Sequence, residues 1–353
     1  MAPLLDVKDL RVHFATEDGV VKAVDGVSLA VEAGKTLGVV GESGSGKSVS
    51  MLTMMGLTRT SNATISGTVN FEGRELLSMS DQELRSVRGN DIAMVFQDPL
   101  SSLHPFYRVG TQLVEAMQAH RSISSSAARA RAVELLGTVG IPDPKQRVDA
   151  YPHELSGGMR QRAMIAMALS NEPKLLIADE PTTALDVTVQ AQILQLLARL
   201  QRELGMAVVL ITHDLGVVAE VTDHIAVMYA GRVVEAATTE KVFTSPEHPY
   251  TWGLLRSIPR LDKPRDEPLI PIPGLPPSLI NLPGGCSFHP RCPYVRERHR
   301  RVVPELEPLP DDPSHRVACL LDSGTRKRIW AELRAGKDPQ EARTAVHFEE
   351  EPA

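Results

Sequence analysis

The chain has 353 residues, a formal net charge of −6 and a pI near 6.0, and 42% of its residues are hydrophobic. This length and composition fit one large globular domain with a smaller one attached. The acidic balance argues against nucleic acid as the main partner, because binding a phosphate backbone requires a basic surface. Since no apolar run approaches the ~20 residues that span a bilayer and the N-terminus lacks the features of a signal peptide, we expect a cytosolic protein that reaches a membrane only through a partner.

The start of the chain predicts antiparallel strands followed by one short buried strand. Residues 4–33 alternate apolar and polar side chains, with turn signals at Glu17–Gly19 and at Ala33–Gly34. Residues 36–40 predict a short apolar strand, and a helix is expected to begin near Val49. This strand and this helix flank residues 41–48.

That stretch, residues 41–48, matches the Gly-x4-Gly-Lys-[Ser/Thr] loop that wraps a nucleotide's phosphates in backbone N–H groups. Its glycines permit positive φ and close backbone approach, and the helix N-terminus behind the loop favours an anion. In such loops the lysine reaches the β- and γ-phosphates and the final hydroxyl ligates Mg²⁺. The predicted nucleotide-binding residues are Gly41, Glu42, Ser43, Gly44, Ser45, Gly46, Lys47 and Ser48.

Further along the chain, strands alternate with helices, which predicts a mostly parallel sheet. Apolar periodicity, capping residues and glycine or proline stops define these elements. The expected elements are a strand pair in 63–74, a helix at Asp81–Val87, a strand at Ile92–Phe96, helices between Val109 and about Ser170, a strand at Leu175–Ala178, a helix at Thr188–Leu204 and a strand at Ala207–Ile211.

The strand at 175–178 runs directly into two carboxylates, Asp179 and Glu180. At the carboxyl edge of a parallel sheet such a pair falls beside the phosphate loop. Asp179 suits Mg²⁺, a hard cation that takes oxygen ligands, and Glu180 could activate an attacking water as a general base. An ordinary acidic helix cap after a strand is the alternative.

Residues 155–162 read Leu-Ser-Gly-Gly-Met-Arg-Gln-Arg. Ser156 is a good N-cap, and the two glycines leave the following N–H groups open to an anion. A second phosphate site in one chain makes sense if a neighbouring subunit's nucleotide completes it. The stretch resembles the Leu-Ser-Gly-Gly-Gln signature of the ATP-binding subunits of ABC transporters, with Met159 at its last position and Gln161 two residues later, as in the peptide-transporter branch.

The resemblance implies an α/β fold: an ABC-type P-loop ATPase domain in residues 1–260, with a RecA-like mixed sheet, an antiparallel β subdomain and a helical subdomain at about 100–170. It also implies that two such subunits close head to tail over two ATP molecules, the phosphate loop of one facing the signature of the other. The residues implied at this second half of the site are Ser156, Gly157, Gly158 and Gln161.

Further roles follow from the resemblance. Gln97 is expected to sense Mg²⁺ and water, His213 to contact the γ-phosphate, and Asp186 to lie in the loop that meets the opposite subunit. Together with Glu180 these give a catalytic set of Glu180, His213 and Gln97, and an Mg²⁺ set of Ser48, Gln97 and Asp179. Phe14 is expected to stack on adenine, the alternative being a core aromatic residue of a strand.

After residue 260 the amino-acid composition of the chain changes. Eight prolines between 259 and 283 predict an extended linker at 261–285, because they exclude a helix or a central strand. Residues 286–321 hold all three cysteines, and 322–353 form a charged, mobile tail with one short helix around Ile329, Trp330 and Leu333.

The clustered cysteines suggest metal ligation more than disulfides. Residues 248–251 and 288–294 resemble the ends of oligopeptide and dipeptide importers, whose extension carries four cysteines. Here His299 stands where the third is expected, giving the ligand set Cys286, Cys292, His299 and Cys319. Three thiolates and an imidazole suit a 4Fe-4S cluster, which the resemblance favours, or zinc.

We therefore expect an ATP-hydrolysing subunit that powers uptake of di- and oligopeptides. Its expected partners are a homologous ATPase subunit, two membrane permease subunits and, indirectly, an extracytoplasmic binding protein, and its expected place is the cytoplasmic face of the membrane. Nickel, opines or sugar-derived cargo are alternatives, as is a permease-free ATPase with a metal-binding regulatory module. A DNA-repair or chromosome-structure ATPase would need a long coiled-coil insertion and a basic surface, and this chain is too short and too acidic.

Overall fold

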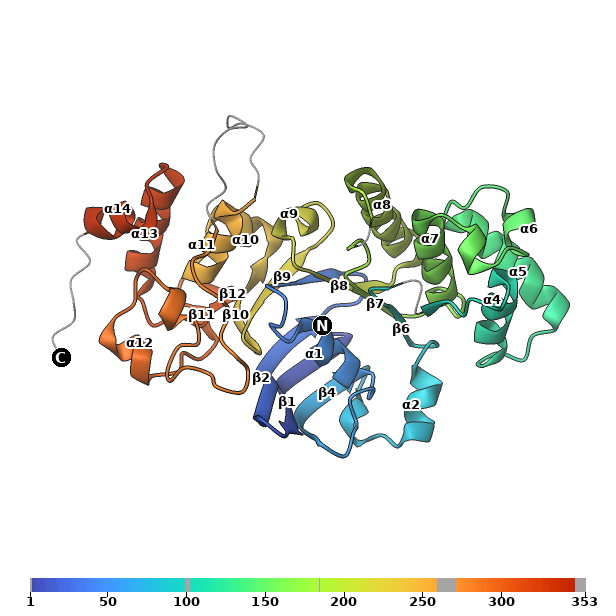
Figure 1. The fold of residues 1–353 in the computed structure, drawn as a ribbon, viewed down its shortest axis with the longest axis horizontal. Helices are drawn as coiled ribbons and strands as arrows, with labels where there is room; N and C mark the ends of the chain where they lie inside the picture. Colours follow the sequence, from blue (N-terminus) through green and yellow to red (C-terminus); the bar gives the residue numbers. More distant parts are fainter. Residues whose placement is uncertain (1, 99–101, 184, 259–270, 347–353) are drawn as a thin grey trace.

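The computed structural model describes residues 2–98, 102–183, 185–258 and 271–346 (Figure 1). Part of the predicted linker, residues 261–270, and the end of the predicted tail, residues 347–353, lie outside the described residues. Residues 271–285, which belong to the predicted linker, contain no helix or strand, as their prolines require.

An eight-stranded mixed sheet organises the molecule, in the order β11-β12-β10-β9-β3-β8-β7-β6. The five strands from β9 to β6 are parallel to their neighbours, whereas β9–β10, β10–β12 and β12–β11 pair antiparallel. The strands are β3 (Thr36–Val40), β6 (Ile92–Val95), β7 (Leu175–Asp179), β8 (Ala207–Thr212), β9 (His224–Tyr229), β10 (Arg232–Thr238), β11 (Glu307–Leu309) and β12 (Asp312–Val317). The mixed α/β architecture predicted from the sequence is confirmed, but β11 and β12, within the predicted metal-binding region, were not foreseen.

A smaller antiparallel sheet, in the order β2-β1-β4-β5, lies against one face of the main sheet (Figure 1). Its strands are β1 (Leu5–Thr16), β2 (Gly19–Val31), β4 (Ala63–Phe71) and β5 (Arg74–Glu75). Buried side chains from both sheets, such as Leu5, Val12, Val39 and Ile211, form one core with Met51 of the first helix. The alternation seen in the sequence therefore points one face of each strand into this core.

The helices cover the remaining surfaces, and α4 to α7 gather at one end of the molecule, at the right of Figure 1. A second core joins these helices to the other face of the main sheet. Among the described residues, no helix has both the length and the apolar character needed to cross a membrane. The helices are α1 (Lys47–Met54), α2 (Asp81–Val87), α4 (Val109–Gln118), α5 (Ser125–Thr138), α6 (Pro144–Arg147), α7 (Gly157–Ala168), α8 (Val187–Leu204), α9 (Leu215–Val218), α10 (Thr239–Thr244), α11 (Pro249–Arg256), α12 (Glu297–Arg301), α13 (Ser323–Arg334) and α14 (Pro339–Ala345), with short 3₁₀ turns at Leu76–Ser78, Pro152–Glu154 and His289–Arg291.

The helix predicted around Ile329, Trp330 and Leu333 is present as α13, and the tail also forms a second helix, α14, that was not predicted. Ile329 and Leu333 of α13 share a buried cluster with Trp252 of α11 and Tyr294, and Ala342 of α14 completes it. The apolar residues of the tail are too sparse to show a clear helical period, and their burial depends on a cluster that includes aromatic residues from other parts of the chain. Up to residue 346 the predicted mobile tail is therefore packed against the body of the protein.

His248, which caps α11, is a fully buried polar residue at the junction of the main sheet and the C-terminal region. Its Nδ1 accepts a hydrogen bond from the Tyr250 N–H at 3.1 Å. The backbone N–H groups of Glu247 and His248 donate to the carboxylate of Glu235 on β10, and His315 Nε2 of β12 lies 2.7 Å from the same carboxylate. Burial lowers the pKa of His248 to about 4, with the nearby Glu235 charge opposing that change.

This burial predicts acid sensitivity. Because the folded pKa of His248 lies below the unfolded value of about 6.5, the unfolded chain binds more protons between pH 6.5 and 4, and the free energy of unfolding falls as the pH is lowered through that window. The loss attributable to His248 is roughly 3 kcal/mol. Urea unfolding of the native chain and of His248→Asn at pH 7, 6, 5 and 4 should show a shallower dependence in the variant. An equal pH dependence of the free energy of unfolding in the two proteins would contradict the assignment of the acid sensitivity to His248.

Candidate nucleotide-binding and catalytic site

The loop at residues 41–48 lies where predicted, between the end of β3 and the start of α1. Gly44 and Gly46 have φ values of +77° and +96°, which a side chain strongly disfavours. A Cβ at Gly41 would overlap the carbonyl oxygen of Met228, and one at Gly46 would overlap that of Ala23. The loop thus approaches the backbones of β9 and β2 so closely that only glycine fits at these two positions.

Lys47 is 5% exposed, and its amine lies inside the loop. It donates hydrogen bonds to the carbonyl oxygens of Gly41 at 2.7 Å and Glu42 at 3.0 Å. Burial lowers the pKa of Lys47, while the carboxylates of Glu180 and Asp179 act in the opposite direction. The ammonium is therefore held next to the backbone groups expected to receive phosphates.

Ser48 and Asp179 meet as the sequence predicts for a magnesium site. The Ser48 hydroxyl donates to Asp179 Oδ1 at 2.9 Å. Asp179, at the end of β7, is 6% exposed. Burial raises the pKa of Asp179. The hydrogen bond from Ser48 opposes this rise, and the negative charge of Glu180 adds to it. A buried carboxylate and a hydroxyl, both oxygen donors, fit the chemistry of a hard divalent cation.

The three predicted catalytic residues converge on one carboxylate oxygen. Glu180 Oε2 accepts a hydrogen bond from Gln97 Nε2 at 3.0 Å, and His213 Nδ1 lies 3.4 Å away from it. The structure brings Gln97, Glu180 and His213 together because they follow β6, β7 and β8, which end at the same edge of the sheet. Glu180 has φ +44°, a strained conformation for a residue other than glycine, of a kind that clusters at functional sites.

Sequence reasoning missed Thr183, whose hydroxyl donates to the same Glu180 oxygen at 2.8 Å. Its N–H bonds the Glu180 carbonyl at 3.3 Å, closing a turn. The signal available in the sequence was the Pro-Thr-Thr stretch directly after Glu180, which favours a turn and places a hydroxyl three residues on.

The signature residues form a separate surface at the start of α7. Ser156 caps the helix and accepts a hydrogen bond from the Met159 N–H at 3.3 Å, and Ser156 and Gly157 are exposed. The loop before α8 lies beside them, since a Cβ at Gly157 would stand 3.6 Å from Leu185, and the exposed Asp186 caps α8. Two loops predicted to meet a neighbouring subunit are thus adjacent in space.

Gln161 does not share this surface, because it is only 1% exposed. Five residues after Ser156, it points about 140° away around the helix axis, toward the core. Phe14, the predicted adenine-stacking residue, is half-buried on β1 and packs against the core between the two sheets. The roles of Gln161 and Phe14 in nucleotide binding stay predictions, and the burial of Gln161 does not support its role.

The predicted cysteine residues do not form a metal-binding arrangement in the described part of the chain. All three cysteines are free, and among the described residues no group of three or more His, Cys, Asp or Glu side chains is arranged to hold a metal ion. Burial raises the pKa of Cys286, Cys292 and Cys319, the last to about 11. His299 is buried, and its Nδ1 accepts a hydrogen bond from the Arg296 N–H at 3.0 Å.

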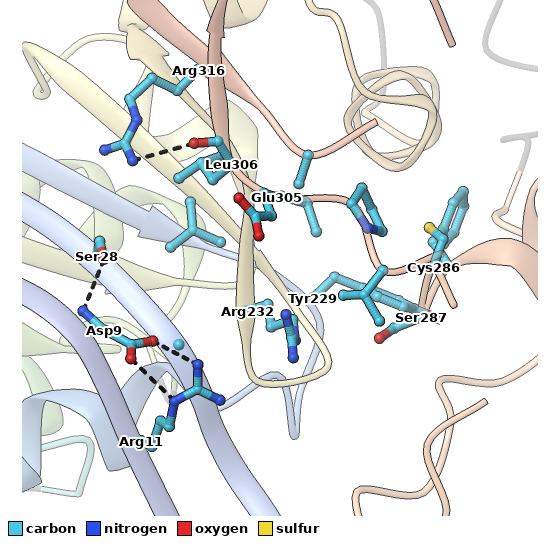
Figure 2. A pocket seen from close by; sticks show the side chains of 17 residues that line it. Asp9, Arg11, Ser28, Tyr229, Arg232, Cys286, Ser287, Glu305, Leu306 and Arg316 are labelled. Carbon is cyan, nitrogen blue, oxygen red and sulfur yellow. Dashed lines mark hydrogen bonds and ion pairs between the residues drawn. The ribbon is translucent and has the colours of Figure 1, made fainter. Parts of the chain in front are cut away.

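A cavity of about 280 Å³ lies between the small sheet and the C-terminal region, away from the phosphate loop (Figure 2). Two of its arginines are already paired: Arg11 lies 2.8 Å from Asp9 and 2.9 Å from Asp25, and Arg232 lies 2.6 Å from Asp25. These charges neutralise one another, so the cavity gives no clear indication of a charged ligand.

The fold and the site together define an ATP-binding cassette ATPase. The model of the ABC transporter family matches residues 24–183, and the model described as oligopeptide/dipeptide transporter, C-terminal region, matches residues 234–298. Among solved structures, the ATP-binding cassette MJ0796, a dimer in a post-hydrolysis state bound to ADP and Pi, is similar with a TM-score of 0.60 and 28% identity, over 67% of this chain and 98% of that one.

Two relatives of known name show which kind of ABC transporter ATPase the chain is similar to. The chain is 53% identical over 306 residues to the oligopeptide transport ATP-binding protein OppD of Haemophilus influenzae, covering 87% of this chain and 94% of the relative. It is 49% identical over 326 residues to the dipeptide transport ATP-binding protein DppD of Escherichia coli, covering 92% and 99%. The chain belongs to the ABC transporter family, in the group of oligopeptide and dipeptide transport ATP-binding proteins, as the sequence resemblance implied.

The two positive-φ glycines of the loop offer a matched test of its packing. Gly44→Ala adds a Cβ with no atom within 4 Å, so it should cost only the left-handed strain of about 1–2 kcal/mol. Gly46→Ala adds the same strain and an overlap with the Ala23 carbonyl, and should lower the free energy of unfolding by more than about 3 kcal/mol. Urea unfolding of the nucleotide-free protein measures both, and equal losses would contradict the close approach.

Proposed function

We propose that this chain is the ATP-hydrolysing subunit of an ABC importer that powers the uptake of di- and oligopeptides through a membrane permease. The observation that carries the proposal is the convergence of Gln97, Glu180 and His213 beside a buried Lys47, in a chain 53% identical to an oligopeptide transport ATP-binding protein. That constellation supplies charge stabilisation and proton transfer, the two things that phosphoryl transfer to water requires.

The residues of the loop receive the phosphates of ATP, and Lys47, held by the carbonyls of Gly41 and Glu42, contacts them with its ammonium. Ser48, Asp179 and the amide oxygen of Gln97 would hold Mg²⁺, which neutralises charge on the β- and γ-phosphates when bound. Glu180 orients the attacking water or takes its proton. His213, half-exposed at the mouth of the site, bonds the γ-phosphate.

The exposed signature surface supports a site shared between two subunits. Ser156 and Gly157 present the N-terminus of α7 to solvent, where backbone N–H groups favour an anion. The phosphate of a neighbour's ATP would fill that position, and Asp186 would meet the same neighbour. We propose a homologous ATPase subunit as that neighbour, with Phe14 stacking on adenine in each nucleotide site.

The chain would reach the membrane through its partners. We propose that it sits peripherally on two permease subunits at the cytoplasmic face, served indirectly by an extracytoplasmic binding protein that delivers the peptide. The names of the relatives, which are transport ATP-binding proteins for oligopeptides and dipeptides, support this assembly.

Replacing the proposed general base tests the mechanism. Glu180→Gln keeps the acceptor for Gln97 and Thr183 but cannot take a proton, so ATP hydrolysis by the assembled transporter should fall by about 10²–10⁴-fold while ATP binding persists. Glu203→Gln, an exposed carboxylate on α8 paired with Arg199, is the control and should leave turnover unchanged. Turnover in Glu180→Gln equal to that of the control rejects the role of Glu180.

We also propose a 4Fe-4S cluster on Cys286, Cys292, Cys319 and His299, with zinc as the alternative. The support is that the three thiols are close enough for Cys319 and Cys286 to add to the rise that burial causes in the pKa of Cys292. Buried thiols become thiolates only beside a cation, and an iron–sulfur cluster or zinc would supply one.

The residue sets 1–260, 261–285 and 286–321 stay our proposed division of the chain.

Metal content decides this proposal directly. Protein purified anaerobically should be brown and contain iron and acid-labile sulfide, and Cys292→Ser should lose both. Colourless protein with stoichiometric zinc would replace the cluster by zinc, and protein with neither metal would leave the thiols as buried core residues.

A further inference from the structure

Glu42, the second residue of the phosphate loop, is held by a residue 249 positions later in the chain. Arg291 Nη1 donates to Glu42 Oε2 at 2.6 Å, and Arg291 Nη2 donates to Oε1 at 3.0 Å. The arginine side chain is 4% exposed. A bidentate pair of this kind fixes the orientation of the carboxylate as well as its distance.

The guanidinium is itself held rigidly. Its Nε donates to the Pro273 carbonyl at 2.9 Å and its Nη2 to the Ile272 carbonyl at 3.3 Å. The rings of Tyr229 and Phe288 lie with their centroids 5.8 Å and 6.0 Å away. Although burial opposes it, the contacts with Glu42 and Tyr229 raise the pKa of Arg291, which stays charged.

The backbone of Glu42 is held at the same time. Its N–H donates to the Tyr250 hydroxyl at 2.9 Å, and its carbonyl accepts from Lys47 at 3.0 Å and from the Ser45 N–H at 3.2 Å. The side chain, the backbone N–H and the carbonyl of Glu42 therefore all have hydrogen-bond partners. Two of the partners, Tyr250 and Arg291, come from the region that follows the last ATPase motif at His213.

We infer that Arg291 is a positioning residue for nucleotide binding, through which the C-terminal region holds Glu42 and with it the phosphate loop. The carbonyls of Gly41 and Glu42 orient Lys47, so releasing the Glu42 side chain loosens the amine that meets the phosphates. The inference rests on the proposed function, in that ATP is the ligand of the loop. It makes the C-terminal region part of the nucleotide site.

A second buried ion pair serves as a control that separates a role of the Arg291–Glu42 pair in nucleotide binding from a purely structural role. Arg326 and Glu247 form a second buried ion pair at 2.6 Å, with side chains 6% and 3% exposed. Because Glu247 lies in the ATPase domain, this pair likewise joins the C-terminal region to that domain, and Arg326 is also held by the Leu321 carbonyl at 2.6 Å. The hydrogen bonds and the ion pair of Arg326 within the described residues involve no residue of the phosphate loop.

The experiment compares Arg291→Lys, Glu42→Gln, the double variant and Arg326→Lys in the full chain, measuring Kd for MgATP by calorimetry and Tm without nucleotide. Arg291→Lys and Glu42→Gln should each raise Kd roughly tenfold or more, about 1.4 kcal/mol, and the double variant should be no weaker than the weaker single variant. Arg326→Lys should lower Tm by about as much as Arg291→Lys does, and should leave Kd for MgATP within about twofold of the native value. In the assembled transporter, Arg291→Lys should raise KM for ATP and leave kcat near that of the native chain.

Equal Kd values in the native chain, Arg291→Lys and Glu42→Gln would overturn the inference and make the pair a structural contact only. Additive effects in the double variant would also overturn it, since the two residues would then act separately. If Arg291→Lys fails to fold, Glu42→Gln alone decides, because its similar size preserves the packing while its single, uncharged acceptor oxygen cannot form the bidentate pair. A native chain that binds no ATP would instead defeat the proposed function, so the two failures are distinguishable.

Discussion

The close approach of the phosphate loop to two neighbouring strands is the constraint on which the rest of the site depends. With a carbonyl oxygen where a Cβ would stand at both Gly41 and Gly46, the loop has one path between β3 and α1. That path turns the carbonyls of Gly41 and Glu42 inward, and Lys47 follows them into a buried position. A charged amine is costly to bury without partners, so the loop is built to be completed by an anion.

The catalytic groups depend on a second constraint, the parallel order of β6, β7 and β8. Strands that run the same way deliver their following residues to one edge, and Gln97, Glu180 and His213 each stand just beyond such an end. The small sheet and the helical end of the molecule contribute no residue to this cluster. Phe14 lies on the small sheet, and the exposed Ser156 lies at the start of α7 in the helical end.

The sequence predicts the features in which a short stretch carries its own meaning. The loop at 41–48, the Asp179–Glu180 pair and the helix cap at Ser156 need only their neighbours in the chain to be recognised. What it did not predict depends on distant contacts. Strand β12 forms by pairing with β10, α14 by packing under Trp252, and the Arg291–Glu42 pair joins positions that no local pattern links. The burial of Gln161 was also not predicted, because a motif gives residues in order whereas a helix turns them to different faces.

The pairing of β12 with β10 has a consequence for where the ATPase domain ends. Without the residues after 260, the outer edge of β10 would present unpaired backbone N–H and C=O groups, and the buried Glu235 would lose His315. An open edge of this kind invites pairing with another chain. In the whole protein the outermost strand on that side is β11, only three residues long, which offers little template for such association. By pairing with β10, the C-terminal region covers a sheet edge of the ATPase domain, so the main sheet extends well past the last nucleotide-binding motif in the chain.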